Sequence, residues 1–193
     1  MTETYQTILS VAKDLFVKQG YTATSMRQVA EAVGIGKATI YHHFPDKQAI
    51  LMTLVKTNVG RMHDALVAIE VEGDPRRRFE IAAIESIRFL YESADLLQIA
   101  RREVPNAREH MLSKYFAFYE QYVQLLKEAL VRGMEMKIFR PHNPEEAARV
   151  FMTMIQGSFA FVYLTGNRTE KPEQAAARLL DIFFNGINAE PQR

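Results

Sequence analysis

Apolar residues recur every three or four positions along most of the chain, a spacing that predicts helices rather than strands. Residues 4–19 place five apolar side chains on one helical face, namely Ile8, Leu9, Ala12, Leu15 and Phe16. No strand pattern, internal repeat or low-complexity segment is present. The pattern therefore predicts an all-α protein of about nine helices.

Residues 25–47 predict two short helices joined by a tight turn. Ser25 and Gln28 have the spacing of a capping box, which starts a helix at the next residue. Gly34 can adopt the positive φ of a helix-ending turn. Pro45 excludes the helical conformation from the residue before it, so the second helix ends there. This is the layout of a helix-turn-helix, which places its second helix in the major groove of DNA.

The second of these helices carries side chains suited to DNA. Its N-terminus lies at Gly36 and Lys37, where free amides and the helix dipole attract phosphate. Ala38 can contact a thymine methyl, Arg27 a guanine or a phosphate, and Lys47 the flanking backbone. Side chains able to donate to phosphate oxygens or base edges are Lys37, Thr39, Tyr41, His42 and His43. The alternative is that these residues form only the solvated faces of a three-helix domain.

The wider pattern of roughly the first 50 residues resembles the signature of the TetR/AcrR (tetracycline-repressor) family of transcriptional regulators. The matching residues are Gly20-Tyr21, Thr24-Ser25, Val29-Ala30, Val33-Gly34-Ile35, Lys37, Ile40-Tyr41-His42-His43-Phe44 and Lys47. The resemblance implies that seven residues face DNA, namely Ser25, Arg27, Lys37, Thr39, Tyr41, His42 and Lys47. Two departures leave the operator sequence open: Gly36 stands where many members have a capping serine, and Ala38 where glycine is frequent.

The rest of the chain predicts further helices, at about 46–69, 75–91, 94–104, 107–137, 144–166 and 172–188. Asp46, Asp74 and Asn143 are expected to cap three of them. We expect residues 1–47 to form a helix-turn-helix DNA-binding domain. Residues 48–193 are expected to form a helical ligand-binding and dimerisation domain, with the helix at 46–69 as the mechanical link.

The last two helices, about 144–166 and 172–188, predict a homodimer. Residues 150–164 are apolar almost all round, yet the run is too short and too interrupted by polar residues to span a membrane. A helix so apolar must be covered on every side, and the remaining chain is too short to do this. A four-helix interface, two helices from each subunit, is the simplest solution and is also what the family resemblance implies.

Five aromatic rings within residues 115–122 either fill a core or line a cavity for an apolar ligand. The candidate ligand-binding residues are His63, Phe89, Phe116, Tyr119, Phe151, Ile155 and Phe159. A partly exposed His63 with an ordinary partner is the alternative for that residue. Few charged residues fall on the inferred inner faces, so we expect an apolar or aromatic effector. Binding would displace the distal half of helix 46–69 and move two DNA-reading domains out of their groove spacing.

Composition excludes several classes of protein. Apolar residues make up 48% and charged residues 24% of the 193 residues, as in ordinary globular proteins. The absence of cysteine excludes disulfides and thiolate zinc sites, and the N-terminus lacks a secretory pattern, so we expect a cytoplasmic protein. Because the net charge is only +1, DNA affinity would depend on where cations and amide dipoles point.

No set of residues suggests catalysis. Gly36-Lys37 is not a phosphate-binding loop, because position 31 is Glu and position 38 is Ala. The adjacent His42 and His43 point to different faces of a helix, which suits no single metal. We therefore expect no enzyme activity, cofactor, metal or membrane partner. The predicted function is a ligand-responsive regulator, a repressor, that binds a pseudo-palindromic double-stranded DNA operator as a dimer and is released by a small-molecule effector.

Two alternatives remain open at this point. One is a helical small-molecule-binding protein or enzyme with a vestigial helix-turn-helix. The other is a DNA-binding protein that has no effector.

Overall fold

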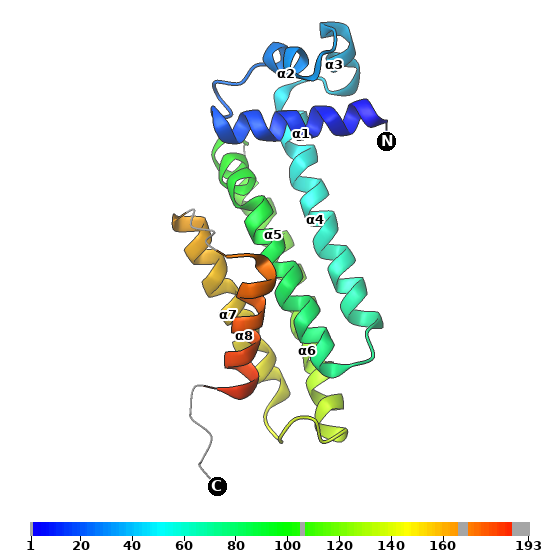
Figure 1. Ribbon diagram of the computed structural model, residues 1–193, viewed down its shortest axis with the longest axis vertical. Helices are drawn as coiled ribbons and strands as arrows, with labels where there is room; N and C mark the ends of the chain where they lie inside the picture. The colour runs from blue at the N-terminus through cyan, green and yellow to red at the C-terminus, as the bar shows by residue number, and fades with distance from the viewer. Residues whose placement is uncertain (1, 105–106, 166–169, 187–193) are drawn as a thin grey trace. The chain divides into compact units, whose positions relative to one another are not determined.

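The computed structural model describes residues 2–104, 107–165 and 170–186, with the backbone alone for residues 107–115, 159 and 163. Eight helices make up most of the described chain, and no strand occurs in it. They are α1 (Glu3–Lys18), α2 (Met26–Val33), α3 (Lys37–His43), α4 (Lys47–Val71), α5 (Pro75–Glu103), α6 (Ala107–Glu135), α7 (Pro144–Thr165) and α8 (Pro172–Asn185) (Figure 1). The predicted all-α class is confirmed.

Helix α5 corrects the expected number of helices. The sequence predicted two helices, with a break between residues 91 and 94, but α5 is continuous from Pro75 to Glu103. No glycine or proline interrupts it, and Leu90, Ala94 and Leu97 continue one buried stripe across the expected break. Burial of this stripe outweighs the weak helix preference of the intervening Ser93. The predicted break between residues 91 and 94 was wrong, and the described part of the chain has eight helices where about nine were expected.

The chain divides into two compact units. The first comprises Met1–Gly60 with Ser93–His110, and the second comprises Arg61–Glu92 with Met111–Arg193. This division differs from the predicted boundary after residue 47, because the first half of α4 and the end of α5 belong to the first unit. The functional boundary at residue 47 stays a prediction.

The first unit has a small apolar core that holds the three N-terminal helices together. Helix α1 packs on α2, and α2 contacts α3 (Figure 1). Each of these helices, and the first turn of α4, contributes side chains that are fully or almost fully buried, among them Ile8, Phe16, Val29, Ile40 and Ile50. These are the apolar positions of the helical pattern, so the hydrophobic spacing alone decides which faces turn inward.

The second unit has an aromatic core. Phe79 of α5 packs edge-on against Phe151 of α7, with 4.8 Å between ring centroids, and stacks on Phe183 of α8 at 5.4 Å. Helices α7 and α8 lie side by side (Figure 1). Gly133 near the end of α6 admits the ring of Phe139, since a Cβ at Gly133 would lie 2.2 Å from Phe139 Cδ2. Edge-on and stacked rings of this kind favour one packed arrangement over others.

Three predicted helix caps are confirmed. The Asp46 carboxylate accepts a hydrogen bond from Ala49 N at 2.7 Å, and that of Asp74 accepts one from Arg77 N at 2.9 Å. The Asn143 side chain accepts from Glu145 N at 3.1 Å. Each cap satisfies an amide that would otherwise lack a helical partner. Among the helices of the described chain, none combines the length and hydropathy needed to cross a membrane.

Candidate nucleic-acid interface

The predicted capping box at the start of α2 is present. Ser25 Oγ accepts a hydrogen bond from Gln28 N at 3.2 Å, while Ser25 N donates to Gln28 Oε1 at 2.8 Å. The hydroxyl of Ser25 also donates to Gln28 Oε1, at 3.0 Å. These bonds fix where α2 begins, so Ser25 has a structural role beside the DNA contact that the sequence predicts for it.

The turn between α2 and α3 depends on Gly34. This residue has φ +79° and ψ +30°, in the left-handed region. Gly34 N and Ile35 N both donate to the Ala30 carbonyl, the latter at 3.0 Å. Orphan carbonyls at the end of α2 are thereby satisfied, and residues 34–36 connect α2 to α3.

Helix α3 divides cleanly into a buried and an exposed face. Ile40 is fully buried, and Phe44, which ends the helix with an extended backbone, is 2% exposed. The predicted DNA-facing residues Gly36, Lys37, Ala38, Thr39, Tyr41 and His42 are all exposed. Lys37 Nζ lies 6.0 Å from the Tyr41 ring centroid, so two of these side chains lie close together.

His43 and Arg27 have partners within the chain. The His43 ring is half-buried and meets the Tyr5 ring edge-on at a centroid distance of 6.2 Å. Arg27 is exposed and its Nε donates to Glu31 Oε1 at 2.7 Å. This hydrogen bond raises the pKa of Arg27 above its ordinary value. The guanidinium has four further N–H donors, so Arg27 could contact a base edge or a phosphate while it keeps this bond.

Lys47 lies in a different environment from the other predicted DNA-facing residues. Its side chain is half-buried, and its Nζ donates to two main-chain carbonyls, those of Tyr21 and, at 2.8 Å, Thr24. The amine also lies over the Tyr21 ring, 4.2 Å from the centroid. Sequence reasoning missed these contacts, because they join residues 23 and 26 positions apart.

Six of the seven predicted ligand-binding residues can be located, since the side chain of Phe159 lies outside the described residues. Phe151 and Ile155 are buried in the packed core of the second unit. His63 and Phe116 are exposed, and Phe116 retains 59% of its surface. Phe89 and Tyr119 are half-buried, the latter with Arg149 Cζ 6.0 Å from its ring centroid. No described pocket brings these residues together.

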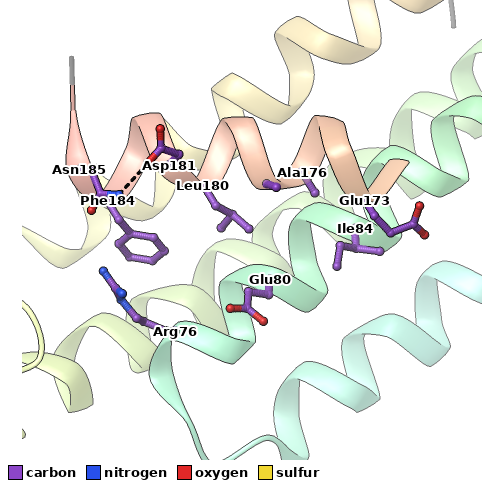
Figure 2. A pocket seen from close by; sticks show the side chains of 10 residues that line it. Arg76, Glu80, Ile84, Glu173, Ala176, Leu180, Asp181, Phe184 and Asn185 are labelled. Atoms are coloured by element: carbon purple, nitrogen blue, oxygen red, sulfur yellow. Dashed lines mark hydrogen bonds between the residues drawn. The ribbon is translucent and has the colours of Figure 1, made fainter. Parts of the chain in front are cut away.

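A pocket of about 340 Å³ lies instead between α8 and the first part of α5, within the second unit (Figure 2). Ile84, Leu180 and Phe184 supply apolar walls, and Arg76 Cζ lies 4.9 Å from the Phe184 ring centroid. Glu173, at one end, accepts from Arg88 Nη2 at 2.7 Å, and this bond lowers the pKa of Glu173. The pocket is therefore amphiphilic. No feature of the sequence pattern predicted this pocket.

No group of three or more His, Asp or Glu in the described residues has an arrangement that could hold a metal ion. His42 and His43 have ring centroids 5.6 Å apart at an interplanar angle of 67°, without a third candidate ligand. Among its described residues, the first unit therefore has hydrogen-bond donors on the exposed face of α3 but no candidate metal site.

Comparison with known proteins agrees with the helix-turn-helix geometry. The family described as bacterial regulatory proteins, tetR family, matches residues 8–53, and the tetracyclin repressor-like C-terminal domain matches residues 72–187. The HTH-type transcriptional repressor Rv1474c of Mycobacterium tuberculosis is 34% identical over 182 residues, covering 93% of this chain and 90% of that protein. The uncharacterized HTH-type transcriptional regulator YvkB of Bacillus subtilis is 27% identical over 192 residues, covering 98% of this chain and 100% of its own.

The fold is also that of solved TetR-type structures. The crystal structure of AibR in complex with isovaleryl coenzyme A and operator DNA superposes with a TM-score of 0.59. It covers 94% of this chain and 98% of AibR, at 23% identity, which shows a common fold. The chain belongs to the TetR family of bacterial regulatory proteins. It is a transcriptional regulator rather than an enzyme.

Proposed function

We propose that this regulator is a repressor that binds a pseudo-palindromic operator as a homodimer and is released by a small, apolar or aromatic effector. One observation supports the DNA-binding part of this proposal. Ile40 anchors α3 in the core, while the neighbouring Lys37, Thr39 and Tyr41 remain exposed. An anchored helix presents the same polar face at every encounter, which is what reading a base sequence requires.

The exposed side chains would divide between two roles. Lys37 and Tyr41, one turn apart on α3, would position the protein on phosphates. Thr39 and Arg27 would contact base edges and set the sequence preference. Two copies of α3 related by a two-fold axis would enter major grooves about 34–36 Å apart.

An equilibrium titration of the full-length protein with its own upstream DNA tests this proposal. Tyr41→Ala and Lys37→Ala should weaken every operator variant to a similar degree, whereas Thr39→Ala should change the ranking among base substitutions. Lys56→Ala, an exposed cation on α4, is the matched control and should bind like the wild type. Absence of any sequence-preferring complex of the wild type at physiological salt would refute the proposal and favour a vestigial helix-turn-helix.

The surface of α7 supports a homodimer. Val150, Phe161 and Leu164 retain 55%, 55% and 80% of their surface, and with Gly157 they follow one another at helical spacing on one stripe. A Cβ placed on Gly157 would meet nothing within 4 Å. The absence of a side chain there thus has no reason within the protomer, and it suits the close approach of a second helix. On α8, Ile182 is 43% exposed.

Analytical ultracentrifugation of Leu164→Lys tests the interface. A buried cation without a partner should shift the protein to monomer and lower its affinity for a two-half-site operator. Val71→Lys is the matched control, because Val71 at the end of α4 is 78% exposed and lies outside the proposed interface. A dimer that tolerates Leu164→Lys as well as Val71→Lys would exclude this interface.

We propose further that the effector binds in the second unit. The solved complex of AibR with isovaleryl coenzyme A and operator DNA supports an effector for a regulator of this fold. Phe151 and Ile155 could reach a ligand only if the packed core opened, whereas the α5–α8 pocket is already open. Displacement of α4, which is continuous from Lys47 to Val71, would then alter operator affinity. A coupling of about 1–3 kcal/mol corresponds to a change of about 5- to 150-fold.

A thermal-shift screen with lipophilic compounds, followed by operator titration, tests the effector. A compound that raises the melting temperature should also release DNA. Leu180→Trp, which fills the α5–α8 pocket, and Tyr119→Ala, at the predicted ring wall, distinguish the two locations by which variant abolishes the response. If no lipophilic compound changes either quantity, the chain is a DNA-binding protein without an effector of this class.

A further inference from the structure

Lys47 occupies a position that its charge alone does not favour. It is the first residue of α4, and the N-terminus of a helix carries a partial positive charge that disfavours a cation. The Asp46 cap offsets part of this charge, but its carboxylate is bonded to Ala49 N, and no acidic residue lies in the first turn itself. A lysine here therefore needs a partner elsewhere, and a DNA phosphate is only one possible partner.

The structure supplies that partner within the first unit. The segment Tyr21 to Thr24 is a turn in which Thr24 N donates to the Tyr21 carbonyl at 3.2 Å. Lys47 Nζ donates to the carbonyls at both ends of this turn, those of Tyr21 and Thr24. Two of the three ammonium hydrogens are thus directed at main-chain oxygens of the protein itself.

Further contacts hold the amine in place. The Tyr21 ring, which lies under Nζ, is 8% exposed and meets Phe16 of α1 edge-on at 5.0 Å. Burial lowers the pKa of Lys47, while the nearby Glu103 carboxylate favours its charged form. The Thr24 hydroxyl donates to the Gly20 carbonyl at 2.8 Å, so the turn is bonded from its other side as well.

The contacts of Lys47 affect the DNA-reading helices through Ser25. Thr24 directly precedes Ser25, the N-cap of α2, and Lys47 directly follows the Asp46 cap of α4. The amine therefore connects the start of α2 to the start of α4, and α3 lies between them in the chain. We propose that Lys47 is a positioning residue that fixes how the helix-turn-helix is presented, and that it is not a phosphate contact.

The salt dependence of operator binding separates these two roles, and this arm rests on the proposed DNA-binding function. Removing one cation that binds a phosphate lowers the slope of log K against log salt by about 0.9. Lys37→Ala, with an exposed lysine on α3, should therefore lower the slope by about 2 for a dimer. Lys47→Ala should weaken binding about 10-fold or more while its slope stays that of the wild type.

Stability provides a second readout that does not depend on DNA. Lys47→Ala should lower the melting temperature by about 4–8 °C, whereas Lys37→Ala should leave it unchanged. Amide exchange in residues 22–28 should become faster in Lys47→Ala only. Lys47→Arg keeps a long cationic donor and should recover most of the stability, while Lys47→Met keeps the stem without the donor and should not.

Two results would overturn the assignment. One is a Lys47→Ala protein with unchanged melting temperature and a salt slope reduced as much as in Lys37→Ala, which would make Lys47 a phosphate contact. The other is wild-type stability and amide exchange in Lys47→Met. If wild-type protein forms no sequence-preferring complex, the proposed function fails, but the melting and exchange measurements still decide whether Lys47 holds the turn.

Discussion

Replacement of Gly34 by alanine isolates the cost of a single backbone conformation. Gly34 has φ +79°, and a Cβ added there would meet nothing within 4 Å. Any loss of stability in Gly34→Ala must therefore come from the left-handed backbone rather than from a steric collision with another part of the chain.

The expected magnitude follows from two opposing terms. A non-glycine residue in the left-handed region costs roughly 1–2 kcal/mol. Alanine also restricts the unfolded chain, which returns about 0.4–1 kcal/mol. The net loss is about 1 kcal/mol, or about 2–4 °C in melting temperature for a chain of this length.

Gly60→Ala is the matched control. Gly60 lies inside α4, has no positive φ, and likewise has nothing within 4 Å of an added Cβ. The same chemical change should there stabilise the protein by about 0.5–1 kcal/mol, because alanine is the better helix former. Thermal unfolding followed by circular dichroism at 222 nm compares the two variants. A rise in melting temperature for Gly34→Ala like that for Gly60→Ala would show that the turn does not need a left-handed residue.

Three further predictions concern stability. Ser25→Ala removes the capping box of α2 and should cost about 1 kcal/mol in thermal unfolding; an unchanged melting temperature would contradict it. Phe79→Ala leaves a cavity among Phe151 and Phe183, and should cost about 3–5 kcal/mol in urea titration; a loss below 1 kcal/mol would mean that the aromatic core is loosely packed. Burial raises the pKa of Tyr122 from 10.0 to about 12. Its contribution is therefore fully present below pH 10 and is lost as the pH rises through 12. Over that interval the wild type should lose about 2–3 kcal/mol that Tyr122→Phe does not lose, as urea titrations on both sides of pH 10 would show.

The helix boundaries near the DNA-reading segment follow from the sequence because their causes are local. Ser25 and Gln28 form the capping box over three residues, Gly34 ends α2 within its own turn, and Pro45 acts on its immediate neighbour. Interactions of this range need no knowledge of the rest of the fold. The exposed polar face of α3 follows in the same way, because the apolar Ile40 marks which face is buried.

Other features depend on contacts between distant segments. Periodicity placed Phe116 on a seam facing a core, which was wrong because Phe116 is 59% exposed, whereas Phe151 and Ile155 do fill a core. It also suggested a break in α5 that burial along the helix removes. Gly133 appears in the sequence as an ordinary helix glycine, and only packing shows that the Phe139 ring needs the space.

The sequence by itself determined an all-helical chain with a capped helix-turn-helix, because hydrophobic period and capping act within a few residues, and the resemblance of residues 20–47 to the TetR signature indicated the family. The tertiary structure alone decided that the Lys47 amine binds the Tyr21 and Thr24 carbonyls, and that the described pocket lies between α5 and α8. The hydrophobic period of a helical segment predicts the face on which each of its residues lies. Its partner depends on the chain segment that folding brings opposite, and no local pattern encodes that.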